Sequence, residues 1–147
     1  MAEYVVTDTS VIYSLTKASQ DSRAYQELLG SRRLAMSFRT RTELLSFPFG
    51  SGRKQRLDDL RAAILLLPHA ESTDVWFSLV HERRSQLKKA KQPGADLSEA
   101  DIWIISSALE YRLPLISHDI QQVYLGRAMG LKVLTNLDGL RDDNPEL

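Results

Sequence analysis

Four acidic residues stand where strands end or helices begin in the predicted fold. Asp8 directly follows the strand-like run "YVVT", and Asp119 comes two residues after the strand-like run "LIS". Asp101 and Glu43 lie near the starts of two helical stretches that are otherwise rich in apolar residues. In an open parallel sheet the carboxyl ends of the strands form one edge where ligands bind, so we expect these carboxylates to meet there.

A cluster of four carboxylates needs a counter-ion. Two carboxylates about 4 Å apart repel by ~4 kcal/mol at an effective dielectric constant of about 20. Their pKa values must then rise, or a cation must bind between them. Oxygen ligands without histidine or cysteine suit Mg²⁺ or Mn²⁺, whereas Zn²⁺ usually recruits nitrogen or sulfur. Water held by such an ion can attack a phosphodiester, so the cluster predicts phosphoryl chemistry.

Each acid also has a structural explanation when it is considered alone. The pairs Ser98–Asp101 and Thr40–Glu43 both have the spacing of a capping box, in which an acid follows a hydroxyl residue by three positions. Asp119 can cap the following helix, and Asp8 can complete the turn after its strand. Capping explains acids at helix starts, but it does not predict two acids that follow two strands at one sheet edge.

The composition is that of one soluble domain. The chain has 147 residues, of which 43% are hydrophobic and 26% are charged, enough for one sizeable core. Its 19 basic and 19 acidic residues give no net charge, so any polyanion must be held by local basic groups. The sequence has no cysteine, which excludes disulfides and thiolate metal sites. No segment resembles a signal peptide or a membrane span, and we expect a cytoplasmic protein without membrane contact.

Strand-like and helix-like segments alternate, which predicts an α/β fold with a mainly parallel sheet. The predicted strands are Tyr4–Thr7, Leu34–Met36, Leu65–Leu67, Leu115–Ser117 and Lys132–Leu134. The predicted helices are Val11–Leu15, Asp21–Leu29, Thr42–Phe47, Lys54–Leu65, Thr73–Ala90, Glu99–Tyr111 and Ile120–Met129. Pro48, Gly50 and Gly52 predict a short mobile loop after the third helix. We expect a single domain over residues 1–138 and a polar tail over residues 139–147.

In order and spacing the acidic motifs resemble those of the PIN domain, and within it the VapC-type toxin ribonucleases of toxin–antitoxin modules. "DTSVI", which begins at Asp8, resembles the family's first acidic motif, and "TEL", with Glu43, resembles the second. Asp101 in "DIWIISSA" resembles the setting of the third acid, and Asp119 after "LIS" resembles the fourth. The resemblance extends from "VVTDTSVIY" to the closing segment "LKVL".

The resemblance implies a single PIN-like domain with a five-stranded, mainly parallel sheet flanked by helices, and frequent homodimers. It also implies an endoribonuclease that uses Mg²⁺ or Mn²⁺ and a metal-activated water to cleave RNA. Asp8, Glu43, Asp101 and Asp119 would be its catalytic and metal-binding residues. A cognate antitoxin protein would wrap the toxin and block the acidic pocket.

RNA that binds near an acidic pocket needs a local basic grip. The candidates are basic residues beside Glu43 and on the glycine-flanked loop: Arg39, Arg41, Arg53, Lys54 and Arg56. Contacts between such residues and phosphates weaken as the salt concentration rises.

Two other polar side chains lie next to the acids. The Ser10 hydroxyl can contact substrate or a bound water, and it can equally help to start the helix after Asp8. His118 adjoins Asp119 and is able to touch substrate, but we interpret it as a surface-loop histidine. The remaining histidines lie in unrelated settings, so no pair is singled out for metal-independent acid–base cleavage.

The sequence also leaves room for different functions. A phosphatase of the haloacid-dehalogenase kind has an Asp after its first strand, but it needs a second acid where this chain has Ser10. A receiver-like module would need an acidic pair near Asp8 and a suitably placed lysine. A catalytically inactive PIN-like binding module and a non-toxin RNA-processing nuclease both stay open.

Overall fold

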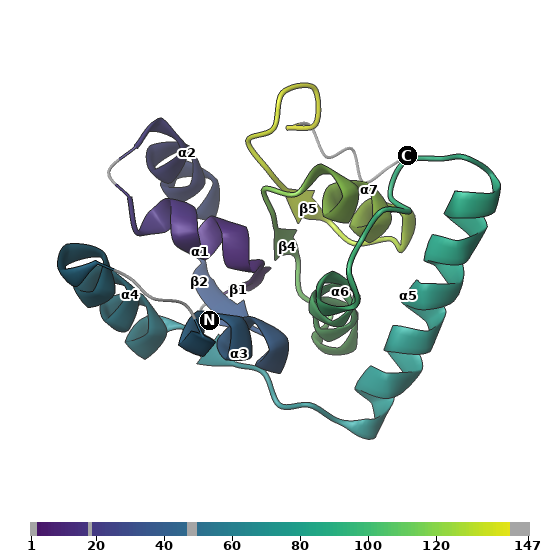
Figure 1. The fold of residues 1–147 in the computed structure, drawn as a ribbon, viewed down its shortest axis with the longest axis horizontal. Coiled ribbons are helices and arrows are strands. Elements are labelled where there is room, and N and C mark those ends of the chain that lie inside the picture. The colour runs from purple at the N-terminus through teal and green to yellow at the C-terminus, as the bar shows by residue number, and fades with distance from the viewer. Residues whose placement is uncertain (1–2, 18, 47–49, 142–147) are drawn as a thin grey trace.

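A computed structural model describes residues 3–17, 19–46 and 50–141 (Figure 1). Within these ranges five strands form one parallel sheet with the order β3-β2-β1-β4-β5. The strands are β1 (Tyr4–Thr7), β2 (Arg33–Met36), β3 (Leu65–Leu66), β4 (Leu115–Ile116) and β5 (Val133–Leu134). The predicted α/β fold with a five-stranded parallel sheet is therefore confirmed.

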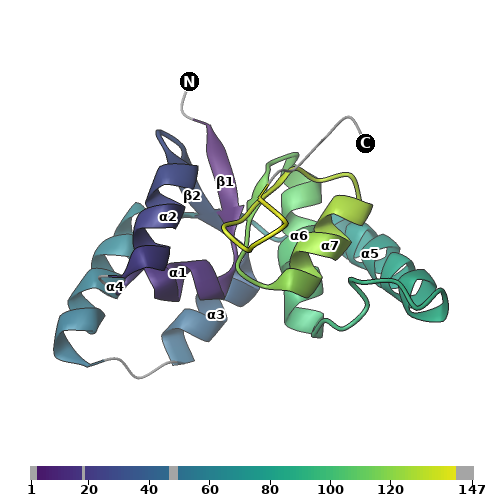
Figure 2. The ribbon, with the colours of Figure 1, turned by 90° about the horizontal axis from the view of Figure 1, so that it is seen from above.

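Helices cover both faces of this sheet. They are α1 (Thr9–Leu15), α2 (Gln20–Leu29), α3 (Phe38–Ser46), α4 (Ser51–Ala63), α5 (Glu71–Lys89), α6 (Glu99–Tyr111) and α7 (Ile120–Ala128). Figure 2 shows α1 to α4 on one side of the molecule and α5 to α7 on the other. Both groups must bury an apolar face against the sheet, as expected for parallel strands joined by helical crossovers.

The central strand β1 shows how the two layers are formed. Val5 and Val6 are both fully buried, and because successive strand residues point to opposite faces they enter different cores. Val5 belongs to the core formed with α1 to α4, whereas Val6 belongs to the core formed with α5 to α7. Both faces are thus occupied, which leaves the strand ends free to form a site.

The strand register brings the ends of β1 and β4 level with each other. Val6 pairs with Leu115 and Thr7 pairs with Ile116. The Asp8 amide then donates a hydrogen bond to the Ile116 carbonyl at 3.2 Å, so the backbone remains paired just beyond the two strands. As a result, the residue after β1 lies beside the loop that follows β4.

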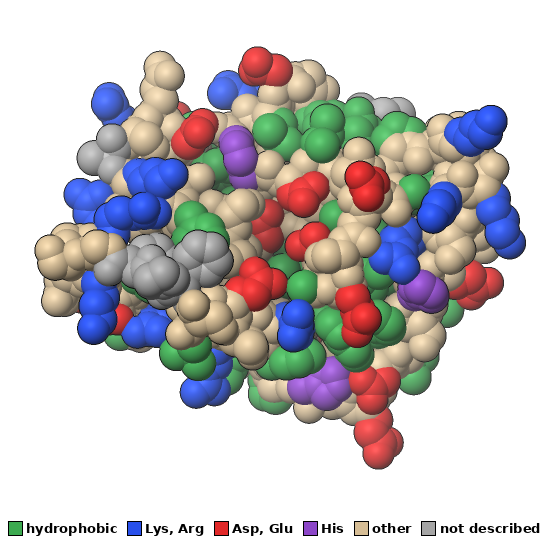
Figure 3. Space-filling view, viewed as in Figure 1, with side chains coloured by type: hydrophobic (Ala, Val, Ile, Leu, Met, Phe, Trp, Pro, Cys, Tyr) green, Lys and Arg blue, Asp and Glu red, His purple; other side chains and the backbone are tan. Residues whose placement is uncertain are grey.

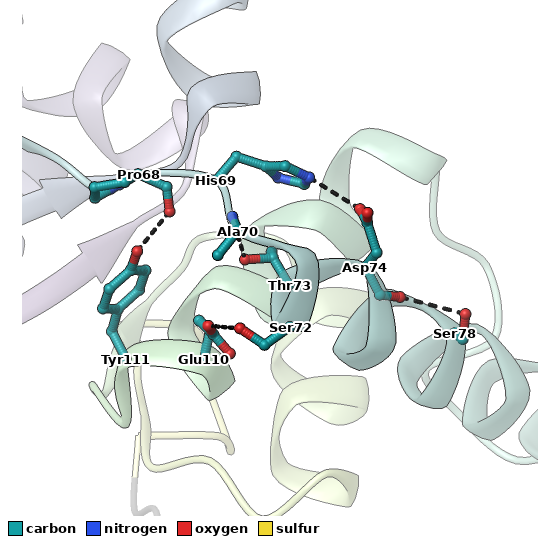
Figure 4. Close-up of polar contacts among 9 residues, drawn as sticks. All are labelled: Pro68, His69, Ala70, Ser72, Thr73, Asp74, Ser78, Glu110 and Tyr111. Carbon is teal, nitrogen blue, oxygen red and sulfur yellow. Dashed lines mark hydrogen bonds and ion pairs between the residues drawn. The ribbon is translucent and has the colours of Figure 1, made fainter.

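Polar contacts attach the start of α5 to the end of α6 (Figure 4). The Tyr111 hydroxyl donates to the Pro68 carbonyl at 2.6 Å, and the Ser72 hydroxyl donates to Glu110. The turn before α5 is closed by the Ala70 amide, which donates to the Thr73 hydroxyl at 3.1 Å. These contacts help to hold α6, whose opposite end carries Asp101.

The predicted mobile loop around Pro48 lies mostly outside the described residues. Residues 47–49 lie outside the described ranges, but α4 already begins at Ser51 after the N-cap residue Gly50. Gly52 lies in the first turn of α4. Arg53, Lys54 and Arg56 all lie on α4, so their assignment to a loop is wrong. The predicted helix Lys54–Leu65 is present, but it begins three residues earlier, at Ser51, and ends at Ala63.

The segment after β5 remains in contact with the domain. Leu137 and Leu140 pack against the core on the α5 to α7 side, and Arg127 donates a hydrogen bond to the Leu140 carbonyl at 2.6 Å. Residues 142–147 of the predicted tail lie outside the described part of the chain. Among the described residues, no helix combines the length and apolar character needed to cross a membrane.

Candidate active site

All four predicted acids line one hollow of about 410 Å³ at the carboxyl edge of the sheet. Its lining comes from the start of α1, the middle of α3, the first turn of α6 and the loop before α7. The residues are Asp8, Thr9, Ser10, Tyr13, Glu43, Asp101, His118 and Asp119. In Figure 3 several acidic side chains lie near the middle of the face, and most of the basic side chains lie toward its two sides. The predicted meeting of four separate segments is therefore observed.

Asp8 is buried and strongly hydrogen-bonded. Its Oδ1 accepts from the Val11 amide at 2.8 Å, so the carboxylate caps α1. Its Oδ2 accepts from the hydroxyls of Ser10 at 2.8 Å and Ser117 at 2.7 Å, and from the His118 amide at 3.2 Å. Burial nevertheless raises the pKa of Asp8 above its ordinary value, and the hydrogen bonds only partly oppose this effect. Asp8 therefore both caps α1 and lines the hollow.

Asp101 lies in the first turn of α6 and feels the other acids. The Ser98 hydroxyl accepts from the Asp101 amide at 3.3 Å and donates to its carboxylate at 2.8 Å, so Ser98 caps α6 as expected. Burial raises the pKa of Asp101, and the negative charges of Asp119 and Glu43 raise it further, while Ser98 opposes the change. The hollow therefore concentrates negative charge.

Glu43 does not begin a helix as predicted, and the proposed capping box with Thr40 is wrong. α3 begins at Phe38, because the buried Ser37 caps it three positions earlier than Thr40 would. The Thr40 amide donates to the Ser37 hydroxyl at 3.2 Å, and the Arg41 amide donates to the Ser37 carbonyl at 3.2 Å. Glu43 thus projects into the hollow from the middle of a formed helix, where its carboxylate is not needed as a cap.

Asp119 has the capping role that its position predicts. Its Oδ1 accepts from the amides of Gln121 at 2.9 Å and Gln122 at 3.2 Å at the start of α7. These contacts use one carboxylate oxygen and fix the direction of the side chain. The residue also lines the hollow, so capping again coincides with a place in the candidate site.

A buried polar network connects Asp8 with the backbone of α6. The Ser117 hydroxyl, which contacts Asp8, also lies 2.8 Å from Gln122 Oε1. The Gln122 side chain is fully buried, and its Nε2 donates to the Asp101 carbonyl at 3.3 Å. Sequence reasoning missed Ser117 and Gln122, because their partners are defined only once β4 lies beside β1.

Thr9 and Tyr13 also line the hollow and were not predicted. The Thr9 side chain is 8% exposed, and its Oγ1 is buried without a hydrogen-bond partner among the described residues. Thr9 Oγ1 is therefore an unsatisfied buried polar atom next to the hollow. Burial raises the pKa of the Tyr13 phenol, Glu43 raises it further, and Arg53 opposes the rise. Their sequence signal was only their position in the first turns after Asp8.

The predicted basic residues are distributed unevenly around the site. Arg39 is four residues before Glu43 and so lies on the same face of α3, with a buried Nε that has no hydrogen-bond partner among the described residues. Arg41 is exposed and does not line the hollow. Arg53 and Arg56 of α4 instead contact the end of α1: Arg53 lies 3.5 Å from the Thr16 hydroxyl, and Arg56 donates to the Thr16 carbonyl at 3.0 Å.

The donor atoms suit a hard divalent cation, although their arrangement is open. Among the described residues, no group of three His, Asp or Glu side chains is positioned to hold one metal ion. Mg²⁺ commonly binds one or two carboxylates and completes its shell with water and substrate phosphate. The carboxylate oxygens of the hollow are therefore of the chemical kind that such an ion binds.

This chain belongs to the PIN domain family, whose model matches residues 5–127. No curated protein sequence matches it significantly. Several solved structures share the fold. VapBC2 from Rickettsia felis, bound to a DNA fragment of its promoter, has a TM-score of 0.66 at 14% identity, and the match covers 90% of this chain and 98% of that chain.

Two further solved structures resemble the fold of this chain to a similar degree. VapBC-1 from nontypeable Haemophilus influenzae has a TM-score of 0.62 at 22% identity, and the match covers 90% of this chain and 97% of that chain. VapBC-5 from Mycobacterium tuberculosis, described as a member of the VapBC family of toxin–antitoxin systems, has a TM-score of 0.59 at 25% identity, with 90% and 96% covered.

Proposed function

We propose that this PIN domain is a Mg²⁺- or Mn²⁺-dependent endoribonuclease and the toxin of a type II toxin–antitoxin pair. The observation that supports the proposal most directly is the shared hollow lined by Asp8, Glu43, Asp101 and Asp119. These acids come from four separated segments, and charge repulsion at Asp101 makes their proximity costly without a cation. Structural likeness to VapBC proteins supports the toxin assignment.

The four acids would supply the carboxylate oxygens for the divalent cation, which would bind one or two of them directly and the others through water. When bound, such an ion activates water and neutralises the charge that develops on a phosphodiester. The chain's own contribution is to hold the carboxylates in position: Val11, Ser10 and Ser117 fix both oxygens of Asp8, and Ser98 fixes Asp101.

The test is cleavage of a mixed pool of single-stranded RNA. We expect cutting with Mn²⁺ or Mg²⁺, none with an excess of chelator, and a loss of at least about a hundredfold in Asp101→Asn, because a charged oxygen near the phosphate is removed. Asp138→Asn, a change on an exposed residue outside the hollow, is the matched control. Equal cleavage in the presence of chelator and by Asp101→Asn would eliminate the metal mechanism. Absence of cleavage by the wild type with either ion would favour an inactive binding module.

We further propose that α4 grips the phosphate backbone of the substrate. Its first half carries three exposed basic residues, Arg53, Lys54 and Arg56, and no acidic residue. The two arginines lie against the end of α1, and the charge of Arg53 acts on Tyr13 in the hollow. An RNA strand that leaves the acids past Tyr13 therefore meets positive charge.

Reversing two of these charges should weaken RNA binding. For Arg53→Glu with Lys54→Glu, the loss of two phosphate contacts should lower the slope of log affinity against log salt by about 1.4, at ~0.7 per contact for single strands. Fluorescence anisotropy with a labelled single-stranded RNA in chelator measures this without cleavage. Lys88→Glu with Lys89→Glu, in the exposed last turn of α5, is the control. An unchanged slope in the α4 variant would contradict this grip.

A cognate antitoxin and a second copy of the chain are the proposed protein partners. The VapBC proteins that share this fold support the antitoxin. α5 exposes Val75 at 62% and Leu79 at 44%, one helical turn apart, and this apolar surface is suited to a protein contact. A growth arrest on expression of the chain, relieved by the product of a neighbouring gene, distinguishes a toxin from an RNA-processing nuclease.

A further inference from the structure

Five aromatic rings meet outside the acidic hollow, where α3, α5 and α6 come together. They belong to Phe38, His69, Phe77, His81 and Trp103, and we refer to them as the ring cluster. The Phe77 ring is stacked on Trp103 at a centroid distance of 4.0 Å, and the rings of Phe38 and His69 meet Trp103 edge-on at 5.6 and 5.2 Å. The exposed His81 ring lies parallel to that of Phe77 at 6.3 Å, so the stack continues along α5.

The ring cluster is only partly covered by protein. Its three largest rings are half-buried, and the His69 side chain is 35% exposed while its Nε2 lies 2.9 Å from Asp74 (Figure 4). By contrast, the two neighbours of Trp103 in α6, Ile102 and Ile104, are buried in the core. The rings therefore present an aromatic surface that a flat ligand can reach.

The ring cluster and the acidic hollow are built on the same two helices. In α3, Phe38 is the first residue and Glu43 follows it by five positions, while in α6 Trp103 follows Asp101 by two positions. At 1.5 Å per residue, these separations correspond to a rise of only about 3 to 8 Å along each helix. Figure 3 shows hydrophobic and histidine side chains on the same face as the acidic ones. A strand bound at the acids is therefore within reach of the rings.

Two arginines accompany the ring cluster. Arg39 follows the first ring of α3 and precedes Glu43 by four positions, and its buried Nε has no hydrogen-bond partner among the described residues. Arg84 lies 2.9 Å from His81 Nδ1 and donates to the Leu97 carbonyl at 2.8 Å, which fixes α5 beside the start of α6. Cations next to aromatic rings are typical of surfaces that bind single-stranded nucleic acids, because phosphates pair with the cations and bases stack on the rings.

A nucleobase is flat and uncharged, so it suits an aromatic surface and not the acidic hollow itself. In single-stranded RNA the bases are unpaired and can stack on protein rings, whereas paired bases are enclosed in the duplex. We propose that a base beside the cleaved phosphodiester stacks on the ring cluster around Trp103 and that the site thereby selects single-stranded RNA. The cluster lies on the α5 to α7 side of the molecule, opposite the basic residues of α4 (Figure 2). This inference rests on the proposed nuclease function and assigns the part of the substrate that lies outside the hollow.

The test compares a short oligoadenylate with a strand of the same length in which stable abasic ribose analogues replace the nucleotides. Both strands carry the same phosphates, but only the first has bases. Fluorescence anisotropy in chelator measures both affinities without cleavage. We expect the wild type to bind the oligoadenylate at least about fivefold more tightly, the value of one stacked base, and Trp103→Leu to lose most of this preference. Trp76→Leu is the matched control, because Trp76 is also half-buried but lines a groove with Lys132 at the amino edge of the sheet.

The salt dependence separates stacking from the grip of α4 on phosphates. Stacking involves no phosphate, so Trp103→Leu should lower the affinity for oligoadenylate and leave the slope of log affinity against log salt unchanged. The charge reversal in α4 should instead change the slope. If Trp103→Leu weakens the binding of both strands equally, or retains the wild-type preference, no base stacks on the ring cluster.

The emission of Trp103 provides a readout that needs no substitution in the ring cluster. The chain has two tryptophans, so Trp103 alone reports in Trp76→Phe. We expect oligoadenylate to quench this emission and the abasic strand to leave it nearly unchanged. Equal quenching by both strands, or no quenching, would overturn the inference. If the emission and the affinities depend on the bases as expected but the wild type cleaves no RNA, the nuclease proposal fails and the base-binding surface stands.

Discussion

Asp8→Asn should lower RNA cleavage by about 10³-fold, the value of roughly 4 kcal/mol of lost stabilisation of the transition state. Asp8 is the most buried of the four acids and the one whose two oxygens are both fixed by hydrogen bonds. The substitution keeps the shape of the side chain but removes the charge that would attract a cation. Initial rates at saturating Mn²⁺, for wild type and variant, measure the loss.

The same variant should remain folded, because two effects on its stability oppose each other. Removing a buried charge favours the folded state, as the raised pKa of Asp8 indicates. The new amide group, however, must present N–H where the carboxylate accepted from the amides of Val11 or His118, and one unpaired buried amide costs about 1–3 kcal/mol. Circular dichroism checks that the fold is kept. Cleavage by a folded Asp8→Asn within tenfold of wild type would remove Asp8 from the catalytic role.

Much of this site follows from the sequence by simple rules. β1 and β4 are short runs of branched and apolar residues, and helical segments between them require parallel strands. Parallel strands end at one edge, so residues that follow two such strands must be neighbours. The sequence therefore predicts that Asp8 and Asp119 lie close together. Asp101 joins this predicted group because it is an acidic residue in the first turn of the mostly apolar helix α6.

The parts that sequence reasoning missed depend on tertiary contacts. Ser37 and Thr40 are both plausible helix caps, and the choice between them depends on Ser37 being fully buried at the end of β2. Ser117 bonds to Asp8 across 109 positions, and His118 bonds to Tyr25 across 93. Spacing along the chain cannot reveal such pairs, because they arise from the register of β4 against β1.

In the absence of divalent ions, the free energy of unfolding should change with pH in the direction expected for the raised pKa of Asp8. Its pKa in the folded protein lies above the ordinary value of about 3.9 expected for the unfolded chain. The folded state therefore binds the proton more tightly, and the stabilisation that protonation provides is fully present below about pH 3.9 and is lost as the pH rises through the raised pKa. Asp8→Asn cannot titrate, so it should be more destabilised relative to wild type at pH 5 than at pH 8. Chemical denaturation in chelator across this range measures the difference, and an opposite trend would contradict a raised pKa.

Binding of a divalent cation should offset the free-energy cost of burying the ionised carboxylate of Asp8. Ligating carboxylates must be deprotonated, so Mn²⁺ competes with protons and should stabilise the wild type more at pH 8 than at pH 5. At a Mn²⁺ concentration about 100 times its Kd, binding to the folded state alone adds about 2.7 kcal/mol. Asp8→Asn should lose most of this gain, whereas Asp138→Asn, outside the hollow, should keep it. The comparison needs no RNA: if Mn²⁺ stabilises Asp8→Asn as strongly as wild type at pH 8, the ion binds elsewhere on the chain.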